Sequence, residues 1–519
     1  MRAISAVCLL AFVAWTATAD DQYDDPQTFP NRTVIVHLFE WKHSDVAKEC
    51  ENFLSKYEYG AVQISPPNEH IYLEDNGDYP WYTRYQPVSY DLKSRSGNKQ
   101  ELQDMVSRWL DLDKLLEFNG VGTSGDNSFD GNKNSEQFPG VPFGPSDFND
   151  IYCDRDISDD DYRNSKYNVK TCRLAKLLDL DQGKGYVQDR IVDYLNSLVD
   201  LGFAGFRADA AKHMWPDDLK TIFDRVKNLR SDIFGQNQRP FIVCEIIDQG
   251  GEAVNLYEYE NVGRYTNFNF GAYVTQAMWR NVDISTLADL KEGFNYGNGN
   301  TNKVLNFTHP VTLLPAYIYQ IVELQHNKEN NQRDMEHRSV LNYNDGIKYK
   351  MGVAYMLAWD YGYPRVMSSY YFSNHNQGPP NTGKDNGYAT SSPQFDSDDF
   401  CTKESGWVCE HRWFEIREMV KFRHAATGTS VSDVQRGDQM LAFARKGKGY
   451  LALRNADYDY KLNNVQTTLP AGDYCDIFTG GKKDNKCVGT KITVDKNGVS
   501  SFAIPPNSGV AFYVDTKLT

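Results

Sequence analysis

The sequence predicts an α/β fold: a (β/α)8 TIM barrel with an inserted irregular domain and a C-terminal antiparallel β-sandwich domain. Three observations support this. Short apolar runs alternate with helical patterns up to about residue 400, as repeated βα units do. Residues 117–185 interrupt that rhythm and are rich in Gly, Asn, Asp and Pro. From about residue 410, short alternating segments separated by turn residues replace the helical patterns, which is typical of antiparallel strands.

The barrel elements follow from apolar periodicity and from the residues that end each run. Buried strands are predicted, in chain order, at 34–39, 61–64, 203–206, 241–243 and 365–369. Helices are predicted between them at 46–54, 191–199 and 216–229. Gly202 ends the second helix, and Pro216 begins the third. Because functional residues gather at the carboxyl ends of barrel strands, the residues that follow these strands are the ones to inspect.

These patterns divide the chain into four parts. Residues 1–19 are predicted to be a secretory signal peptide, since Arg2 precedes an apolar run at 6–15 and small residues at 17–19 form a cleavage site. The barrel is predicted to occupy 20–116 and 186–409. The inserted domain is predicted at 117–185 and the β domain at 410–519. We therefore expect a secreted, extracellular protein.

The charge composition limits the classes of partner that the chain can bind. The chain has 55 Lys and Arg against 70 Asp and Glu, a formal charge of −15. That charge argues against nucleic acid or an anionic membrane as partner, because both would be repelled. After the predicted signal no stretch reaches the ~18 apolar residues that a membrane-spanning helix needs. Nothing in the sequence points to an oligomer, so a monomer is expected.

Secretion makes disulfides the default state of the cysteines that remain after the signal peptide. Short sequence separations predict three of them, namely Cys153–Cys172, Cys401–Cys409 and Cys475–Cys487. By this criterion Cys50 and Cys244 have no obvious partner.

Two strand ends carry the residues best suited to chemistry. Arg207 and Asp209 lie two apart and face the same way, so the guanidinium would keep the carboxylate ionised. The next strand ends at Glu245, which places a second carboxyl group at the neighbouring strand tip. Two carboxyl groups ~5 Å apart are the arrangement of retaining glycoside hydrolysis. A purely structural salt-bridge cluster would show the same pattern, and the spacing alone does not separate the two interpretations.

Longer strings make the interpretation more specific. The chain contains GFRADAAKHMWP, PFIVCEIIDQGGEA, VHLFEWKHSDVAKECENFL, VQISPPNEH, PWYTRYQPVSY and YPRVMSSYYF. In these strings, from about residue 30 to the C-terminus, it closely resembles the animal-type α-amylases of glycoside hydrolase family 13. The resemblance implies a secreted barrel enzyme with a calcium-binding inserted domain, which hydrolyses internal α-1,4-glucosidic bonds of starch and glycogen with retention.

The resemblance also implies roles for individual residues. Asp209 matches the nucleophile, Glu245 the general acid/base, and Arg207 a chloride ligand that orients the nucleophile. The substrate-binding positions that match are Trp81, Tyr82, Tyr85, Gln86, Lys212 and His213. The calcium ligands that match are the carboxylate of Asp179 and the backbone carbonyls of Lys170 and His213. A hard cation prefers such oxygen ligands.

Two family strings are damaged. Residues 109–117 replace the string that supplies the third barrel strand, a calcium-ligating Asn, a substrate-binding His and the cysteine that would pair with Cys50. The third catalytic Asp is missing as well, because Pro310 or Asn330 stands in its place, depending on the register, around an insert at 311–329. Thr308 and Ile347 stand where two further chloride ligands belong.

These losses leave a second function open, a catalytically impaired homologue that binds glucan or is inactive. They also leave two origins open, a paralogue that lost two barrel segments or a sequence with mis-joined coding segments. The physical cost of removing one strand from a closed barrel favours the second origin.

Overall fold

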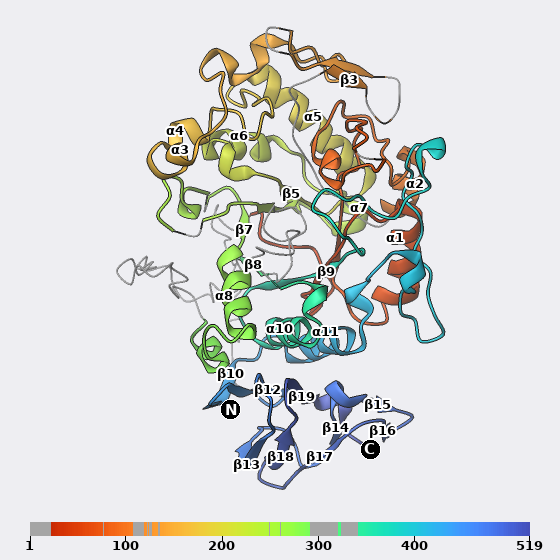
Figure 1. The fold of residues 1–519 in the computed structure, drawn as a ribbon, viewed down its shortest axis with the longest axis vertical. Helices are drawn as coiled ribbons and strands as arrows, with labels where there is room; N and C mark the ends of the chain where they lie inside the picture. Colours follow the sequence, from red (N-terminus) through yellow and green to blue (C-terminus); the bar gives the residue numbers. More distant parts are fainter. Residues whose placement is uncertain are drawn as a thin grey trace, which may run out of the picture.

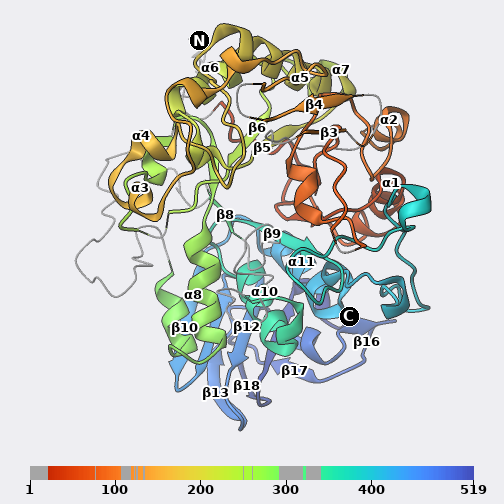
Figure 2. The same ribbon diagram turned by 45° about the horizontal axis from the view of Figure 1, so that its top comes forward.

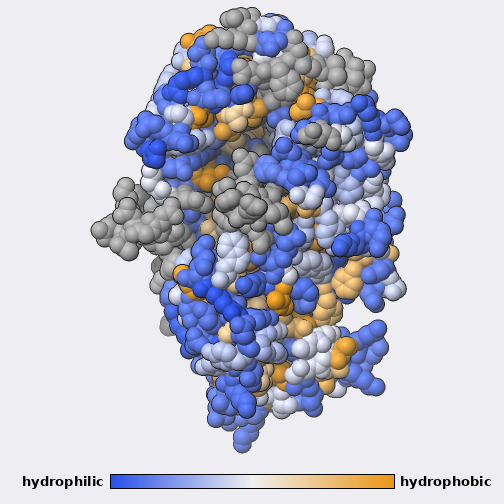
Figure 3. All heavy atoms as spheres, viewed as in Figure 1, coloured by the Kyte–Doolittle hydropathy of each residue, from blue (hydrophilic) through white to orange (hydrophobic). Residues whose placement is uncertain are grey.

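The computed structural model describes residues 22–75, 77–106, 119–121, 123, 127–132, 135–248, 250–259, 261–290, 320–322 and 341–519. The barrel occupies the middle of the molecule in Figure 1. The inserted segment lies at one end, and the last strands of the chain lie at the other. The face drawn in Figure 3 is mostly hydrophilic, in keeping with the excess of acidic residues.

A parallel sheet forms the barrel. Among the described residues it has seven strands in the order β2-β1-β9-β8-β7-β6-β5, and all its pairings are parallel. The strands are β1 (Ile35–Leu38), β2 (Ala61–Ile64), β5 (Gly205–Ala208), β6 (Phe241–Cys244), β7 (Arg264–Thr266), β8 (Gln320–Val322) and β9 (Tyr363–Ser368). Burial on both faces explains why the strands of the first half read as short apolar runs.

Helices cover the sheet. They are α1 (His43–Glu49), which continues as a π-helical turn over Cys50–Leu54, α2 (Lys99–Val106), α5 (Gly185–Leu201), α6 (Pro216–Arg225), α7 (Ser231–Phe234), α8 (Phe268–Met278), α10 (Ile347–Ala358) and α11 (Phe414–Ala426). Gly202 ends α5 with a φ of 111°, which a residue without a Cβ adopts easily. Pro216 begins α6, as its fixed φ predicts.

The two damaged regions have different outcomes. Residues 109–117, which replace the third-strand string, lie outside the described residues. The structure places β8 at Gln320–Val322, between β7 and β9, with Ile321 opposite Tyr363. The segment 311–329, which the sequence comparison marks as an insert, therefore contributes a short strand to the barrel sheet. Pro310 and Asn330 lie outside the described residues.

The inserted segment has an apolar core of its own. It begins with the hairpin of β3 (Asn119–Val121) and β4 (Ser128–Asp130) and includes α3 (Asp159–Asn164) and α4 (Lys166–Val169). Buried aromatic side chains pack together here with leucines of the following loop, among them Phe129, Phe138, Phe143, Phe148 and Leu178. Little of this could be recognised as periodic sequence, because the chain runs mostly in turns.

The C-terminal strands form antiparallel layers below the barrel (Figures 1 and 2). One sheet has the order β10-β11-β12-β19, and β13 pairs with β18, β14 with β17 and β15 with β16. Their bounds are β10 (Val431–Gly437), β11 (Met440–Arg445), β12 (Gly449–Arg454), β13 (Tyr460–Gln466), β14 (Gly472–Cys475), β15 (Lys482–Lys483), β16 (Lys486–Cys487), β17 (Lys491–Val494), β18 (Val499–Ile504) and β19 (Ser508–Tyr513). The strands begin later than the sequence pattern predicts, because α11 occupies 414–426 and packs on α10.

All three predicted disulfides are confirmed, namely Cys153–Cys172, Cys401–Cys409 and Cys475–Cys487. Neither Cys50 nor Cys244 belongs to these three bonds. Cys244 is buried at the end of β6, and burial raises the pKa of its thiol to about 12. In the part of the chain that the structure describes, no helix is long and apolar enough to cross a membrane.

Candidate active site

Two neighbouring strands bring the predicted carboxyl groups together. β5 pairs with β6 so that Ala208 lies opposite Cys244, and each strand is followed directly by an acidic residue. The backbone N–H of Glu245 donates to the carbonyl of Ala208 at 2.9 Å, which extends the pairing by one position. Asp209 and Glu245 therefore stand side by side at the carboxyl edge of the sheet.

One guanidinium group joins the two carboxylates. Arg207 Nη1 lies 2.5 Å from Asp209 Oδ1, and Arg207 Nη2 lies 2.6 Å from Glu245 Oε1. The side chains of all three residues are 5 % exposed. Charge-assisted contacts of this length are strong, and little water is present to screen them. One guanidinium group thus offsets one of the two negative charges and holds both carboxyl groups close together.

The turn after β5 adds a backbone donor. Ala210 has a φ of 46°, in the left-handed region, which costs a residue with a Cβ about 1–2 kcal/mol. In this conformation the Ala210 N–H donates to Glu245 Oε2 at 2.7 Å. Glu245 thus has a partner on each carboxylate oxygen, so the strained turn fixes its orientation.

Asp209 also lines a cavity of about 90 Å³ between the barrel and the inserted segment. Its other walls come from α5, α6 and the loop at 178–182, and they include Tyr90, Tyr194 and Met214. Asp179 lines the same cavity. Apolar walls beside a carboxylate strengthen its interaction with any positive charge that develops there.

The two basic residues after the turn contact the neighbouring loops. Lys212 Nζ donates to the carbonyl of Ile247 at 2.7 Å and forms an ion pair with Glu252. His213 Nδ1 lies 3.0 Å from the carbonyl of Val169, so it links the loop after β5 to the inserted segment. Both residues follow Asp209 closely in sequence, and the Lys212 backbone N–H donates to the carbonyl of Glu245 at 3.3 Å.

The predicted sugar-contacting aromatics lie on a single 3₁₀ segment, Trp81–Tyr85, in the loop after β2. Trp81 and Tyr85 are buried and pack edge to face with centroids 6.0 Å apart, while Tyr82 is half-buried. Burial raises the pKa of the Tyr82 phenol. Gln86 follows the segment directly. Since β1, β2, β5 and β6 belong to one parallel sheet, these residues lie at the same edge of the barrel as Asp209.

The predicted calcium ligands belong to the inserted segment and to the loop after β5. The Asp179 carboxylate is buried and accepts a hydrogen bond from Asn149 Nδ2 at 2.7 Å, which orients it. The hydrogen bond between Val169 and His213 brings the Lys170 and His213 backbones close to each other. The donor chemistry, a carboxylate and carbonyl oxygens, fits calcium. No cluster of three or more His, Cys, Asp or Glu side chains suited to a metal occurs among the described residues.

Chloride does not fit the residues present. Both terminal nitrogens of Arg207 contact carboxylates. Ile347, at one of the other two ligand positions, begins α10 and has no polar side-chain atom. Thr308 lies outside the described residues.

Sequence reasoning missed the buried charges around the aromatic segment. Glu40, Arg84 and Arg95 form ion pairs with almost no exposure, behind Trp81. Two of the three residues stood in strings that carry the resemblance, VHLFEW and PWYTRYQPVSY. A charged residue directly after an apolar run was the sequence signal that could have revealed them.

Comparison with known proteins agrees with the geometry. A family profile described as "Alpha amylase, C-terminal all-beta domain" matches residues 431–515. The chain is 39% identical to pancreatic α-amylase 2a5 of Mus musculus over 96% of its own length and 97% of that protein. It is 38% identical to the α-amylase of Tribolium castaneum over 95% and 96% of the two chains.

A solved structure has the same fold. α-Amylase I of Eisenia fetida superimposes with a TM-score of 0.81 at 34% sequence identity, covering 94% of this chain and 98% of that one. A variant of the same worm enzyme was solved in complex with maltohexaose.

Proposed function

The chain belongs to the animal α-amylases, and from that membership we propose that it is a secreted enzyme that hydrolyses internal α-1,4-glucosidic bonds of starch and glycogen with retention. The observation that carries the proposal is the Arg207 guanidinium shared by Asp209 and Glu245. It holds two carboxyl groups at adjacent strand ends, in a buried site, beside a single cation.

The chemistry follows from the two positions. In the first step an Asp209 carboxylate oxygen attacks the anomeric carbon while Glu245 gives its proton to the departing glycosidic oxygen. The bond to the leaving sugar breaks, and a glycosyl ester of Asp209 remains. In the second step Glu245 takes a proton from water as the water oxygen attacks the same carbon, which releases Asp209. Two inversions give net retention.

Arg207 and the Ala210 N–H prepare both groups. The guanidinium stabilises Asp209 as the ionised nucleophile. The Ala210 N–H holds one oxygen of Glu245, so the other oxygen has a fixed direction relative to Asp209. Such preorganised contacts reduce the rearrangement needed as charge develops in the transition state.

Substrate and metal positions belong to the same proposal. Trp81, Tyr82, Tyr85 and Gln86 would contact glucose rings on one side of the bond, and Lys212 and His213 would do so near Glu245. Asp179 and the carbonyls of Lys170 and His213 would hold a calcium ion, which would supply structural support where the insert meets the loop after β5. No step of the reaction is assigned to chloride, because the ligand set does not fit.

The relatives named above are called α-amylases, and this does not favour the impaired homologue considered from the sequence. The test is starch hydrolysis by the full secreted chain with calcium, beside Asp209→Asn and Glu245→Gln. The proposal expects release of reducing ends that either substitution abolishes. Turnover no greater than that of Asp209→Asn would reject it and leave a glucan-binding or inactive protein.

A further inference from the structure

We propose that three buried charges, Glu40, Arg84 and Arg95 (the Glu40 cluster), position the Trp81–Tyr85 segment and thereby set the affinity for glucan. The cluster takes no part in bond cleavage. The inference rests on the proposed function, because it concerns the segment to which that function assigns sugar contacts.

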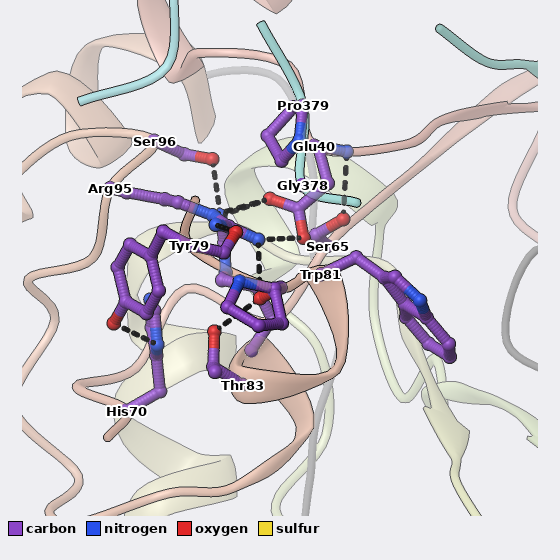
Figure 4. A network of polar contacts seen from close by, with 12 residues as sticks. Glu40, Ser65, His70, Tyr79, Trp81, Thr83, Arg95, Ser96, Gly378 and Pro379 are labelled. Atoms are coloured by element: carbon purple, nitrogen blue, oxygen red, sulfur yellow. Dashed lines mark hydrogen bonds and ion pairs between the residues drawn. The ribbon is translucent and has the colours of Figure 1, made fainter. Parts of the chain in front are cut away.

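The cluster is a tight network (Figure 4). Arg95 binds Glu40 through two parallel contacts, Nε to Oε2 at 3.1 Å and Nη2 to Oε1 at 2.9 Å. Arg84 Nη1 donates to Glu40 Oε2 at 3.0 Å and to Ser96 Oγ at 2.7 Å. A fork-to-carboxylate pair fixes the direction of both side chains as well as their separation.

Burial makes this network costly to disturb. The side chains of Glu40 and Arg84 are 0% exposed and that of Arg95 is 1% exposed. Two guanidinium groups share one carboxylate, so the cluster carries a net positive charge. Removing the acidic partner of a buried pair is strongly destabilising, because it leaves a buried charge without compensation. The arginines also donate hydrogen bonds to backbone carbonyl oxygens, and those carbonyls belong to the loop that carries Trp81.

Glu40 itself is held in an unusual conformation. It lies two residues after the end of β1 and has a φ of 67°, in the left-handed region that residues with a Cβ rarely adopt. Its N–H donates to Ser65 Oγ at 2.9 Å, so the loop after β2 fixes this turn. A strained backbone conformation persists only where surrounding contacts stabilise it. Here the two arginines that bind the Glu40 carboxylate supply those contacts.

Arg95 connects the cluster to the aromatic segment. Its Nη1 donates to the carbonyl of Tyr79 at 2.8 Å, and its Nη2 lies 3.4 Å from the carbonyl of Pro80, the residue before Trp81. The guanidinium also lies over the Tyr79 ring at 4.7 Å. The two residues that lead into the 3₁₀ segment are thus fixed by one arginine side chain.

A second loop closes on the same residues. Trp81 Nε1 donates to the carbonyl of His375 at 2.9 Å, and the Gly378 N–H donates to Asp78 Oδ2 at 2.9 Å. A Cβ on Gly378 would lie 2.0 Å from the Tyr79 carbonyl oxygen, so only glycine permits this approach. The Trp81 indole points away from the guanidinium groups (Figure 4). The buried charges therefore fix the backbone of the segment, whereas other contacts orient the indole ring of Trp81.

The experiment compares Glu40→Gln with Glu49→Gln, a matched control. Glu49 is also buried and paired with an arginine, since Arg412 Nη2 lies 2.6 Å from its Oε2, but it belongs to α1 and not to this loop. Thermal unfolding, kcat and KM on starch are measured for both. In addition, maltoheptaose binding is measured with Asp209→Asn as the background, where no turnover occurs.

We expect both variants to unfold at lower temperature than the parent. Only Glu40→Gln should raise KM and the dissociation constant for maltoheptaose, by about tenfold, with kcat within about threefold of the parent. If Glu40→Gln does not fold, Arg95→Lys replaces it, because lysine keeps the charge and loses the fork, and the same rise is expected. Equal KM and equal binding in the two glutamine variants, or a loss confined to kcat, would overturn the inference. A parent chain that binds maltoheptaose but does not hydrolyse starch would reject the proposed function alone.

Discussion

Replacing Arg207 by glutamine gives the sharpest prediction about the chemistry. The substitution removes two contacts, at 2.5 and 2.6 Å, from two carboxylates that are 5 % exposed. Two unit charges about 5 Å apart repel by about 3 kcal/mol at an effective dielectric constant of about 20. The guanidinium attracts the Asp209 charge by a similar amount and so favours the arrangement that the mechanism needs, with Asp209 ionised and the proton on Glu245; about 3 kcal/mol is on the order of 100-fold, since 1.4 kcal/mol is tenfold.

We therefore expect kcat/KM at pH 7 to fall by on the order of 100-fold. Raising the pH should not reduce the deficit, because it removes the proton that Glu245 must donate. Arg207→Lys keeps the charge with fewer donors and should recover at least tenfold. The assay is a pH series of kcat/KM on a short aryl maltoside, with circular dichroism to confirm folding. A folded Arg207→Gln within threefold of the parent at pH 7 would refute the reasoning.

Three further predictions use other regions. Burial and the nearby Arg84 lower the pKa of His43 from 6.5 to about 3, so below pH 6.5 the unfolded chain takes up a proton and the folded chain does not. Between pH 7 and 4.5 the parent should therefore lose about 3 kcal/mol more stability than His43→Leu. This loss should be seen as a larger drop in Tm, and it should be absent between pH 7 and 8. Chelation of calcium should lower the Tm of the parent by several degrees and leave Asp179→Asn almost unchanged, and an equal drop in both would exclude Asp179 as a ligand. We expect one of the acidic residues that follow β8 in sequence, Glu323, Glu329 and Asp334, to be a third catalytic carboxylate. An amide substitution of that residue should lower kcat at least about 100-fold. Full activity in all three amide variants would contradict this.

The strands of the first half of the barrel could be predicted because they are short, mostly apolar runs bounded by turn residues. β5 and β6 are each followed by a carboxylate, and their spacing placed Asp209 and Glu245 correctly relative to Arg207. Local patterns contain this information, since residues two apart on a strand face the same way.

Other features depend on contacts distant in sequence. β8 is only three residues long and is recognised by its pairing with β7 and β9, which no local pattern shows. Helix α11 falls inside the segment predicted as β domain, and its packing on α10 is a contact between residues distant in sequence. The Glu40 cluster joins residues from the loop after β1 and from the loop after β2, so its pairing could be found only in three dimensions.

Trapping the covalent intermediate tests the central claim most directly. The full chain carrying Glu245→Gln is incubated with an activated maltosyl fluoride, whose departing fluoride needs no proton, and the digested protein is analysed by mass spectrometry. The account predicts a maltosyl ester on the peptide that contains Asp209, and no ester when Asp209→Asn is added. An unlabelled Asp209 peptide with fluoride still released, or an ester on another residue, would contradict it.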